Sequence, residues 1–384
     1  MAGRRNKEMI EKTEFPHFML KEIFEQPQAL ERTIVARVGL SEGEVRIADE
    51  IHIESAELRA LRRINIVASG TSRHAGMAGQ YMFQELACLP ADVDYASEFE
   101  YRNLPIGPEE ITIVITQSGE TADTTAAQRL AKRKGSRTIA ISNVPDSTIA
   151  READGVLYTN AGPEISIAST KAFTAQMAVL FLLATYLAQV REELNREDLH
   201  HWIRELLAIP QKARTVLECS ELCRTLAEHF HRAEDFLFLG RAIHYPVAMD
   251  GALKLKEVSY VHAEGYPAGE TKHGPNALID EHLPVVVIAT CDRRNAGSLL
   301  RYEKTVSDLQ GFKKQSAKIV ALASEGDREV SELADHTIFI PQAPELLAPI
   351  LEIIPLQLFA YYVAVRKGLD VDRPRNLVKS VREE

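Results

Sequence analysis

The sequence predicts an α/β protein made of two tandem domains, each a parallel β-sheet flanked by helices in a flavodoxin-like three-layer sandwich. Short apolar runs typical of strands alternate with stretches of helical periodicity, and this alternation favours a parallel sheet covered on both faces. The order of these runs occurs twice: Ile64 aligns with Phe236, and Ile111 with Leu283, at the same offset of 172 residues. An offset of this length predicts the duplication of a whole domain rather than a short solenoid repeat.

The chain has 384 residues, which is enough for two domains of ordinary size. A polar segment of helical character comes first, and its most regular stretch is FMLKEIFEQPQALERTI at 18–34. We predict five parts: an N-terminal helical segment at 1–55, a first α/β domain at 56–190, a helical linker at 191–232, a second α/β domain at 233–365 and a C-terminal tail at 366–384.

Each half contains four predicted strand regions, several of which run into glycine, serine or threonine where the strand is expected to end. In the first half they are INIVASGTSRHAG (64–76), ITIVITQSGETADT (111–124), RTIAISN (137–143) and GVLYTNAG (155–162). In the second half they are FLFLGRAIHYP (236–246), LPVVVIATCD (283–292), AKIVALAS (317–324) and HTIFIPQ (336–342). Ligands of open parallel sheets bind outside the carboxyl ends of the strands. The loops predicted to line a site are therefore those at 69–72, 116–121 and 240–245.

One stretch of the second half, Gly251–Pro275, begins with helix-forming residues and loses its helical period at Gly265, from where we expect a loop. Lys254 and Glu257 lie three residues apart, so their side chains share one helix face. A helical carboxylate followed by a loop histidine, His273, suits proton transfer on a bound small molecule. An ordinary surface ion pair and a solvated histidine explain this stretch equally well.

Composition and charge limit the possible partners. The net charge of −10 and the pI of about 5.7 argue against nucleic acid as the main partner, although they leave room for a local anion site. The four cysteines fit neither a disulfide framework nor a zinc motif, so we expect free thiols in a reducing compartment. The basic start MAGRRNKEM has no apolar run after it, and the apolar segment 173–190 is interrupted by Gln176 and Gln189. We therefore expect a cytoplasmic protein that does not engage a membrane.

The loop TQSGET at 116–121 follows a strand and opens a helix. The hydroxyl groups of Thr116, Ser118 and Thr121 can point at one place together with the free N–H groups of the helix start, where the helix dipole favours a dianion. Ser72, in the preceding turn, can add another hydroxyl group. Helix capping by serine and threonine explains the loop just as simply. No Walker lysine and no GxGxxG motif is present, so nucleotide binding is disfavoured.

Six motifs along the chain, taken together, resemble a known family. They are ASGTS (68–72), ASEFEYR (96–102), TQSGETADT (116–124), ASTKAFTAQ (168–176), GALKLKEVSYVHAEGYPAGETKHGP (251–275) and PRNLVKSV (374–381). They resemble the sugar isomerase (SIS) domain family, and within it the isomerase half of the glucosamine-6-phosphate synthases. The likeness runs in order from about Phe18 to the end of the chain.

The resemblance implies that the chain binds a phosphorylated hexose or hexosamine, with no cofactor and no metal. The residues that it assigns to substrate binding are Ser72, Thr116, Gln117, Ser118, Thr121, Ser169 and Arg375.

The resemblance also implies four catalytic positions. Glu257 would move a proton between C1 and C2 of the sugar through an enediol or enamine, and Lys254 would lie beside it. His273 would assist ring opening in the site of the neighbouring subunit of a homodimer. Lys379 would form a Schiff base with the ketone at C2, with the tail completing the active site. Judged by its position alone, Lys379 would instead be a solvated charge in a frayed tail.

We therefore expect an amino-sugar phosphate isomerase that interconverts fructose 6-phosphate and glucosamine 6-phosphate with free ammonia, mainly as a deaminase. A glutamine-hydrolysing domain with an N-terminal cysteine is expected to be missing, because the first cysteine is Cys88. One alternative is the isomerase component of a synthase fed by a separate glutaminase subunit. Another is a non-catalytic sugar-phosphate sensor, which would need the phosphate loop but not Glu257, His273 and Lys379 together.

Overall fold

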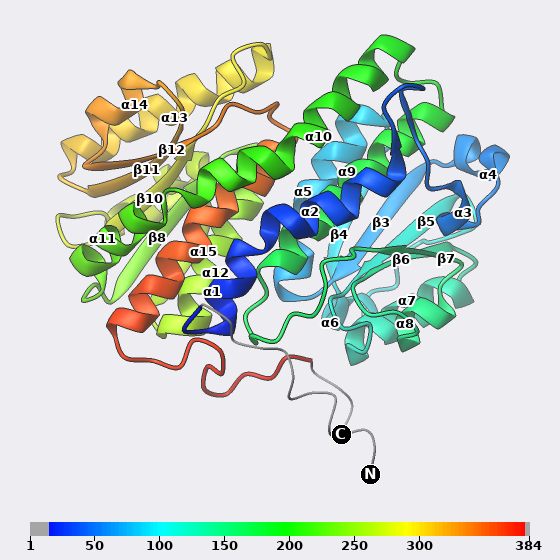
Figure 1. The fold of residues 1–384 in the computed structure, drawn as a ribbon, viewed down its shortest axis with the longest axis horizontal. Helices are drawn as coiled ribbons and strands as arrows, with labels where there is room; N and C mark the ends of the chain where they lie inside the picture. Colours follow the sequence, from blue (N-terminus) through cyan, green and yellow to red (C-terminus); the bar gives the residue numbers. More distant parts are fainter. Residues whose placement is uncertain (1–14, 381–384) are drawn as a thin grey trace.

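The computed structural model describes residues 15–380 and contains two five-stranded parallel sheets (Figure 1). The strands of the first sheet are β3 (Arg63–Ala68), β4 (Ala91–Tyr95), β5 (Glu110–Ile115), β6 (Arg137–Ser142) and β7 (Gly155–Tyr158). Those of the second are β8 (Asp235–Gly240), β9 (His262–Pro267), β10 (Pro284–Ala289), β11 (Lys318–Ser324) and β12 (His336–Ile340). The order β4-β3-β5-β6-β7 in the first sheet matches β9-β8-β10-β11-β12 in the second. The predicted fold class and its duplication are thus confirmed.

Helices separate and flank the two sheets. The first domain contains α5 (Gly70–Leu86), α6 (Ala96–Phe99), α7 (Ala122–Arg133), α8 (Thr148–Glu152) and α9 (Lys171–Val190). The predicted linker contains α10 (Arg196–Leu217) and α11 (Ser220–Phe230). The second domain contains α12 (Tyr245–Ser259), α13 (Ala296–Lys314), α14 (Arg328–Leu333) and α15 (Ala348–Arg366), with 3-10 turns η3 (Ala242–His244), η4 (Ala268–His273) and η5 (Pro275–Leu278).

The N-terminal part mixes helices with a small hairpin. It contains α1 (Phe18–Phe24), α2 (Gln26–Ile34), the 3-10 turn η2 (Val35–Arg37), the antiparallel strands β1 (Val38–Gly39) and β2 (Glu44–Val45), α3 (Ala48–Ile51) and α4 (Ser55–Ala60). The sequence predicted only helices for this segment, because strands of two residues leave no readable alternation.

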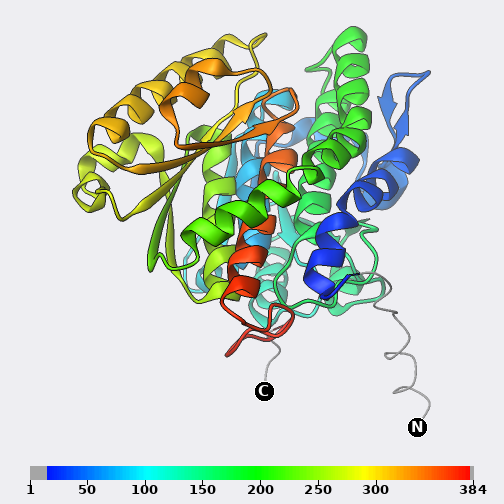
Figure 2. The same ribbon diagram turned by 60° about the vertical axis from the view of Figure 1, so that its left-hand side comes forward.

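The largest hydrophobic cluster lies between the two sheets and belongs to both of them. Ile64 and Ile66 of β3 enter it from one side, and Phe236 and Phe238 of β8 enter it from the other. Helices α5, α9, α12 and α15 pack against one another in this layer (Figure 2). Because successive side chains of a strand point to opposite faces, Val67 belongs to a separate cluster on the far face of the first sheet. The two duplicated units therefore share one central core.

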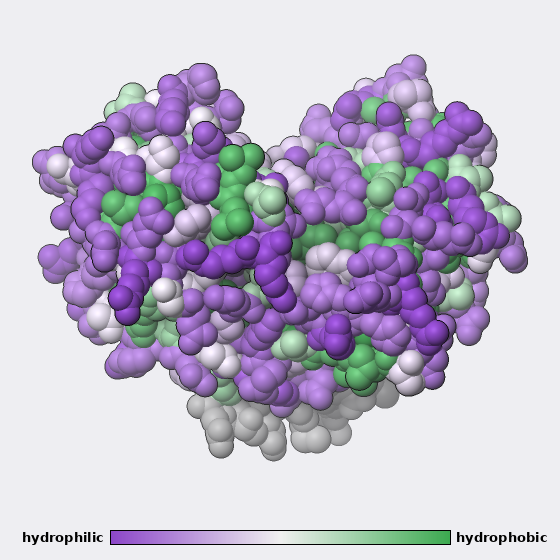
Figure 3. All heavy atoms as spheres, turned by 90° about the horizontal axis from the view of Figure 1, so that it is seen from above, coloured by the Kyte–Doolittle hydropathy of each residue, from purple (hydrophilic) through white to green (hydrophobic). Residues whose placement is uncertain are grey.

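Helices α9 and α15 are apolar and long enough to cross a membrane, yet 89% of the most apolar window of each is buried inside the protein. The predicted buried helix at 173–190 is therefore confirmed as a central core helix. On the face shown in Figure 3, the surface is largely hydrophilic, with apolar side chains in small separate patches.

Two edge strands were not predicted from the sequence. β4 reads ADVDY and β9 reads HAEGYP, and neither has the apolar run that marks the central strands. β9 pairs only with β8, in parallel, at the edge of the second sheet. The prediction of a loop from Gly265 was wrong, because this glycine lies inside β9 and a 3-10 turn follows.

Candidate functional site

The loop between β5 and α7 has a backbone that requires glycine at its centre. Gly119 has φ +70°, and a Cβ atom there would lie 1.9 Å from the Oγ of Ser147. The N–H of Gly119 donates to the Oγ1 of Thr116 over 3.1 Å, and the N–H of Glu120 donates to the Oγ of Ser118 over 3.2 Å. Hydroxyl groups at the carboxyl end of β5 therefore hold the turn in a compact shape.

The hydroxyl group of Thr121 is not used to cap α7. Thr121 occupies the N-cap position without a side-chain capping hydrogen bond, and its Oγ1 lies 3.2 Å from the Oγ1 of Thr116. Helix α7 is twelve residues long, so its start offers free N–H groups and the positive end of a dipole. The simple capping explanation thus does not account for Thr121, and the role of the loop as an anion site stays a prediction.

Ser72 and Gln117 lie beside this loop. The Nε2 of Gln176, on α9, donates to the Oγ of Ser72 over 3.0 Å and so orients the first turn of α5. Gln117 lines one groove together with Glu164. Ser169 is half-buried just before α9 begins, so the substrate-binding residues predicted in the first domain come from the carboxyl edge of one sheet and the helices above it.

The C-terminal segment brings Lys379 to the same edge. Its Nζ donates to the Oε2 of Glu164 and to the carbonyl oxygen of Ser166, each over 2.7 Å. The next residue, Ser380, has its Oγ 3.1 Å from the Oγ of Ser118 in the phosphate loop. Lys379 is therefore a bound ammonium group next to the predicted phosphate loop and not a solvated tail charge.

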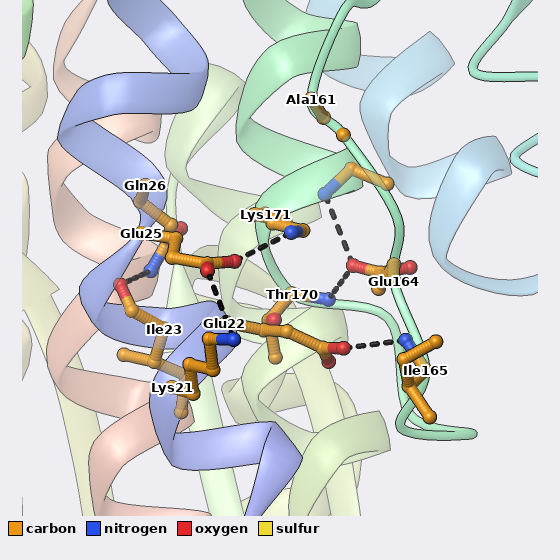
Figure 4. A network of polar contacts seen from close by, with 12 residues as sticks. Lys21, Glu22, Ile23, Glu25, Gln26, Ala161, Glu164, Ile165, Thr170 and Lys171 are labelled. Atoms are coloured by element: carbon orange, nitrogen blue, oxygen red, sulfur yellow. Dashed lines mark hydrogen bonds and ion pairs between the residues drawn. The ribbon is translucent and has the colours of Figure 1, made fainter. Parts of the chain in front are cut away.

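Glu164 anchors this lysine from within the protein. It is buried, and its Oε1 accepts the N–H groups of Thr170 and Ala172 at the start of α9 over 2.9 and 3.1 Å (Figure 4). Burial by itself would raise the pKa of Glu164, but the charge of Lys379 and these hydrogen bonds bring it below its ordinary value. Glu164 is thus an ionised partner for the amine, and the sequence analysis did not single it out.

Lys254 and Glu257 form a buried ion pair on α12. The Nζ of Lys254 lies 2.5 Å from the Oε2 of Glu257, and the two side chains are 0% and 21% exposed. Burial would lower the pKa of Lys254, but the charges of Glu257 and Asp250 raise it above its ordinary value. The surface ion pair considered from the sequence does not exist here, because the ammonium group has no access to solvent.

The tail also contacts the end of α12. The guanidinium carbon of Arg375 lies 4.2 Å from the ring centroid of Tyr260, and the backbone N–H of Arg375 donates to the tyrosine hydroxyl over 2.8 Å. Tyr260 is the left-handed C-cap residue of α12, three residues after Glu257. The C-terminal segment thus contacts both the end of the helix that carries Glu257 and the predicted phosphate loop of the first domain.

His273 is not brought to this cluster by any contact within the described residues. It lies at the end of η4 and is exposed, and its side chain makes no hydrogen bond or ion pair in that part of the chain. Its neighbour Lys272 pairs with Asp308 over 3.1 Å. The sequence-predicted role of His273 in another subunit stays a prediction.

The second sheet has a different chemistry at the corresponding edge. The loop expected at 240–245 as a site wall contains His244, which is buried between Glu345 and Glu352 at 3.4 and 2.9 Å. Burial would lower the pKa of His244, but the two carboxylates raise it to about 10. In this loop the charge of His244 is therefore balanced by two acidic side chains, and the role of 240–245 as a wall of the site stays a prediction.

Cysteine and metal-ligand chemistry add nothing to this region. All four cysteines are free, as expected, and Cys219 and Cys223 have their sulfur atoms 3.7 Å apart. Among residues 15–380, no group of three or more His, Cys, Asp or Glu side chains is arranged to hold a metal ion.

The duplicated parallel sheet, with a hydroxyl-lined loop at the edge of its first half, defines the class of the protein. The SIS domain model matches residues 57–186 and 229–367, and the chain belongs to the SIS domain family. It is similar to glutamine–fructose-6-phosphate aminotransferase [isomerizing] from Chlorobaculum tepidum, with 50% identity over 98% of this chain, and to that from Thermus thermophilus, with 48% identity over 98%. The chain spans about 60% of the length of these relatives.

Solved structures agree with this assignment. The C-terminal domain of glucosamine-fructose-6-phosphate aminotransferase from Francisella tularensis superposes with a TM-score of 0.88 and 36% identity, over 94% of this chain and 100% of that one. Glucosamine-6-phosphate deaminase from Thermotoga maritima superposes with a TM-score of 0.71 over 96% of this chain and 100% of that one. At 21% identity, the second likeness extends to the fold alone.

Proposed function

We propose that the chain is an amino-sugar phosphate isomerase that converts glucosamine 6-phosphate and water into fructose 6-phosphate and ammonia, and the reverse when ammonia is supplied. The observation that most supports it is the position of Lys379, bonded to Glu164 while the adjacent Ser380 contacts Ser118. An amine held beside a loop suited to a phosphate group is what chemistry at C2 of a phosphorylated hexose needs. The names of the relatives from Chlorobaculum tepidum and Thermus thermophilus agree with this substrate class.

The phosphate group would be held by the hydroxyl groups of Thr116, Ser118 and Thr121 and by the N–H groups at the start of α7. Gln117 and Ser72 would contact the sugar from the two sides, and Ser169 would contact it from the start of α9. A helix start gives a dianion both hydrogen bonds and a favourable dipole. This site lies on the first domain alone and would fix the distance between the phosphate and the reacting carbons.

Proton transfer would be carried out by Glu257. Its carboxylate takes the proton from C2 of the open-chain sugar, and the electrons of that C–H bond form the C1–C2 double bond while the oxygen at C1 gains a proton. The same proton is returned at C1, and the nitrogen at C2 loses one proton in exchange for the one gained by the oxygen at C1, which leaves an imine at C2. Lys254 would orient the carboxylate of Glu257 through the 2.5 Å contact.

Lys379 would exchange with the amino group at C2. In this step its neutral amine adds to the C2 imine, ammonia leaves, and water later hydrolyses the enzyme-bound imine to release fructose 6-phosphate. The lysine must first lose a proton, and the Glu164 carboxylate lies 2.7 Å away to receive it. Arg375 would hold the tail in place through Tyr260.

Ring opening would be assisted by His273 from a second copy of the chain. Within the described residues this histidine is exposed and has no partner among the groups named above. We therefore propose a homodimer in which each site receives the imidazole of the partner chain, acting in the cytoplasm.

The test is an assay of the purified protein on glucosamine 6-phosphate that follows fructose 6-phosphate and ammonia together. We expect equal release of both products, a loss of at least about 100-fold in Glu257→Gln, and a loss in Lys379→Met. Exchange between fructose 6-phosphate and glucose 6-phosphate without ammonia release would remove the proposed role of Lys379. Binding of the sugar phosphate without either reaction would mean that the protein is a sugar-phosphate sensor and not an enzyme.

A second candidate uses the same residues in the synthetic direction, with ammonia delivered by a separate glutaminase subunit. Two features of the relatives favour it. Their names describe aminotransferases that act with glutamine, and their chains extend beyond the span of this chain. Addition of ¹⁵N-ammonium with fructose 6-phosphate would then yield labelled glucosamine 6-phosphate, whereas glutamine alone would not.

A further inference from the structure

A buried carboxylate supports the loop that holds Lys379. Glu22 lies on α1 and is 2% exposed, and its Oε1 accepts the N–H groups of Ile165 and Ser166 over 2.5 and 3.3 Å (Figure 4). Its second oxygen, Oε2, is buried and has no hydrogen-bond partner among residues 15–380. A buried carboxylate with one unused oxygen is costly when ionised, so its surroundings must either supply charge or favour the neutral acid.

Glu22 and Lys379 bind the same short segment from different sides. The N–H of Ser166 donates to Glu22, while its carbonyl oxygen accepts the ammonium group of Lys379 over 2.7 Å. The residue before this pair, Glu164, supplies the carboxylate of the lysine. Any movement of Glu22 is thereby passed through one or two peptide units to the groups that hold the amine.

Charged groups from three elements surround Glu22. They are Glu164 on the loop before α9, Lys171 on α9 and Lys379 on the tail. Helix α15, which packs against α1, contributes the neutral side chains Gln357 and Tyr361, which bond to Gln26 and His17. The carboxylate of Asp372 accepts the N–H groups of Phe18 and Met19 at the other end of α1.

The balance of these groups favours the neutral acid at Glu22. Burial and, after it, the negative charge of Glu164 raise the pKa of Glu22 to about 8, although the hydrogen bond from Ile165 and the two lysines act in the opposite direction. Near neutral pH the two carboxyl groups thus carry one charge between them, and that charge faces Lys379.

We propose that Glu22 is a titrating positioning residue for Lys379: as the neutral acid it fixes the segment 164–166 against the amine, and its ionisation adds a second negative charge that keeps the lysine in its ammonium form. The inference rests on the proposed imine-forming role of Lys379. Ionisation releases the Glu22 proton to solvent, and it makes the free amine at Lys379 less available. The free amine that imine formation needs would therefore become available only at a more alkaline pH than in a protein without this second charge.

The experiment measures the reactivity of Lys379 without any substrate. Trace acetylation with acetic anhydride, followed by mass spectrometry of the tail peptide, gives the free-amine fraction from pH 6.5 to 9.5 in the wild type and in Glu22→Gln. We expect equal rates at pH 6.5. At pH 9 we expect rates roughly three- to tenfold higher in the variant, because it lacks the negative charge that the ionised Glu22 carries in the wild type.

The matched control is Glu25→Gln, which removes a carboxylate near the end of the same helix whose partner, at 2.6 Å, is Lys171 instead of Lys379. It should leave the pH dependence of Lys379 unchanged. Acetylation rates of Lys379 in Glu22→Gln that equal those of the wild type at both pH values would overturn the proposal. A rate increase of the same size at pH 6.5 and 9 would overturn it as well, because this result means only a loosened loop.

A second measurement uses only the wild-type protein, so its result does not depend on whether the variant folds. In the wild-type protein labelled with ¹³C at its glutamate carboxyl groups, one resonance should titrate near pH 8. If every glutamate resonance titrates below pH 6, Glu22 is ionised at neutral pH and the proposal is wrong. Neither readout uses a sugar phosphate, so failure of the proposed reaction would be seen separately in the product assay.

Discussion

The hydroxyl group of Ser380 lies 3.1 Å from that of Ser118, although 262 positions separate the two residues in the sequence. This contact places the C-terminal segment directly on the loop at the carboxyl end of β5. A phosphate group bound by the loop would meet the tail residue that follows Lys379. In the proposed reaction, substrate binding and placement of the amine would therefore be coupled through Lys379 and Ser380.

Ser118→Ala should weaken binding of a phosphorylated sugar more than it slows the chemical step. Loss of one hydrogen bond to a charged group costs about 1.5–3 kcal/mol, which predicts a rise in KM for glucosamine 6-phosphate of about tenfold or more. Steady-state kinetics measures this effect, and Ser331→Ala on α14, whose hydroxyl bonds to Arg328, is the control. A fall in kcat with KM unchanged would show that Ser118 does not hold the phosphate.

Lys254→Met should lower both stability and activity. The ammonium group is fully buried against Glu257 and near Asp250, so its removal leaves buried negative charge without a partner. Breaking such a pair costs about 3–5 kcal/mol, and urea denaturation measures the change in unfolding free energy. The exposed Lys256, two positions along the same helix, gives the control Lys256→Met. Similar small losses of unfolding free energy in both variants would mean that burial of the Lys254–Glu257 pair contributes little to stability.

The fold could be predicted because its signals are local. The run INIVA of β3 and its counterpart FLFLG of β8 are mostly apolar and are buried on both faces, as central parallel strands are. Edge strands β4 and β9 have one neighbour each and tolerate Asp, Glu, Gly and Pro, so their sequences do not stand out. The single central core also could not be predicted, because it depends on how the two sheets face each other.

The site was predicted in part, for a related reason. The motif loops carry hydroxyl groups and glycine in a short stretch, so Thr116 and Thr121 were evident. Glu164 and Glu22 were missed, because each acts through a partner far along the chain and neither lies in a stretch of unusual composition. A glutamate five residues before Ser169 was the only signal, and it becomes meaningful only when Lys379 is seen beside it.

The stability of the protein should depend on pH through His244. Its pKa is raised to about 10 by Glu345 and Glu352, so the folded state binds a proton that the unfolded chain releases above about pH 6.5. This contribution is full below pH 6.5 and is lost as the pH rises toward 10. His244→Gln should therefore destabilise the protein more at pH 6 than at pH 9. Equal changes in unfolding free energy at both pH values would contradict the assignment of a charged His244.

Mixing two inactive variants should test whether His273 acts in a partner chain. In a dimer of His273→Asn with Glu257→Gln, one site combines the intact Glu257 of the first chain with the intact His273 of the second. Random exchange of subunits makes half of the dimers mixed, and each mixed dimer has one complete site out of two. About a quarter of the wild-type activity should therefore return. The exposed position of His273, away from the buried pair on α12, agrees with this arrangement. If both residues act within one chain, each site of a mixed dimer still lacks one group. Activity then stays at the level of the separate variants, and the shared-site dimer is excluded.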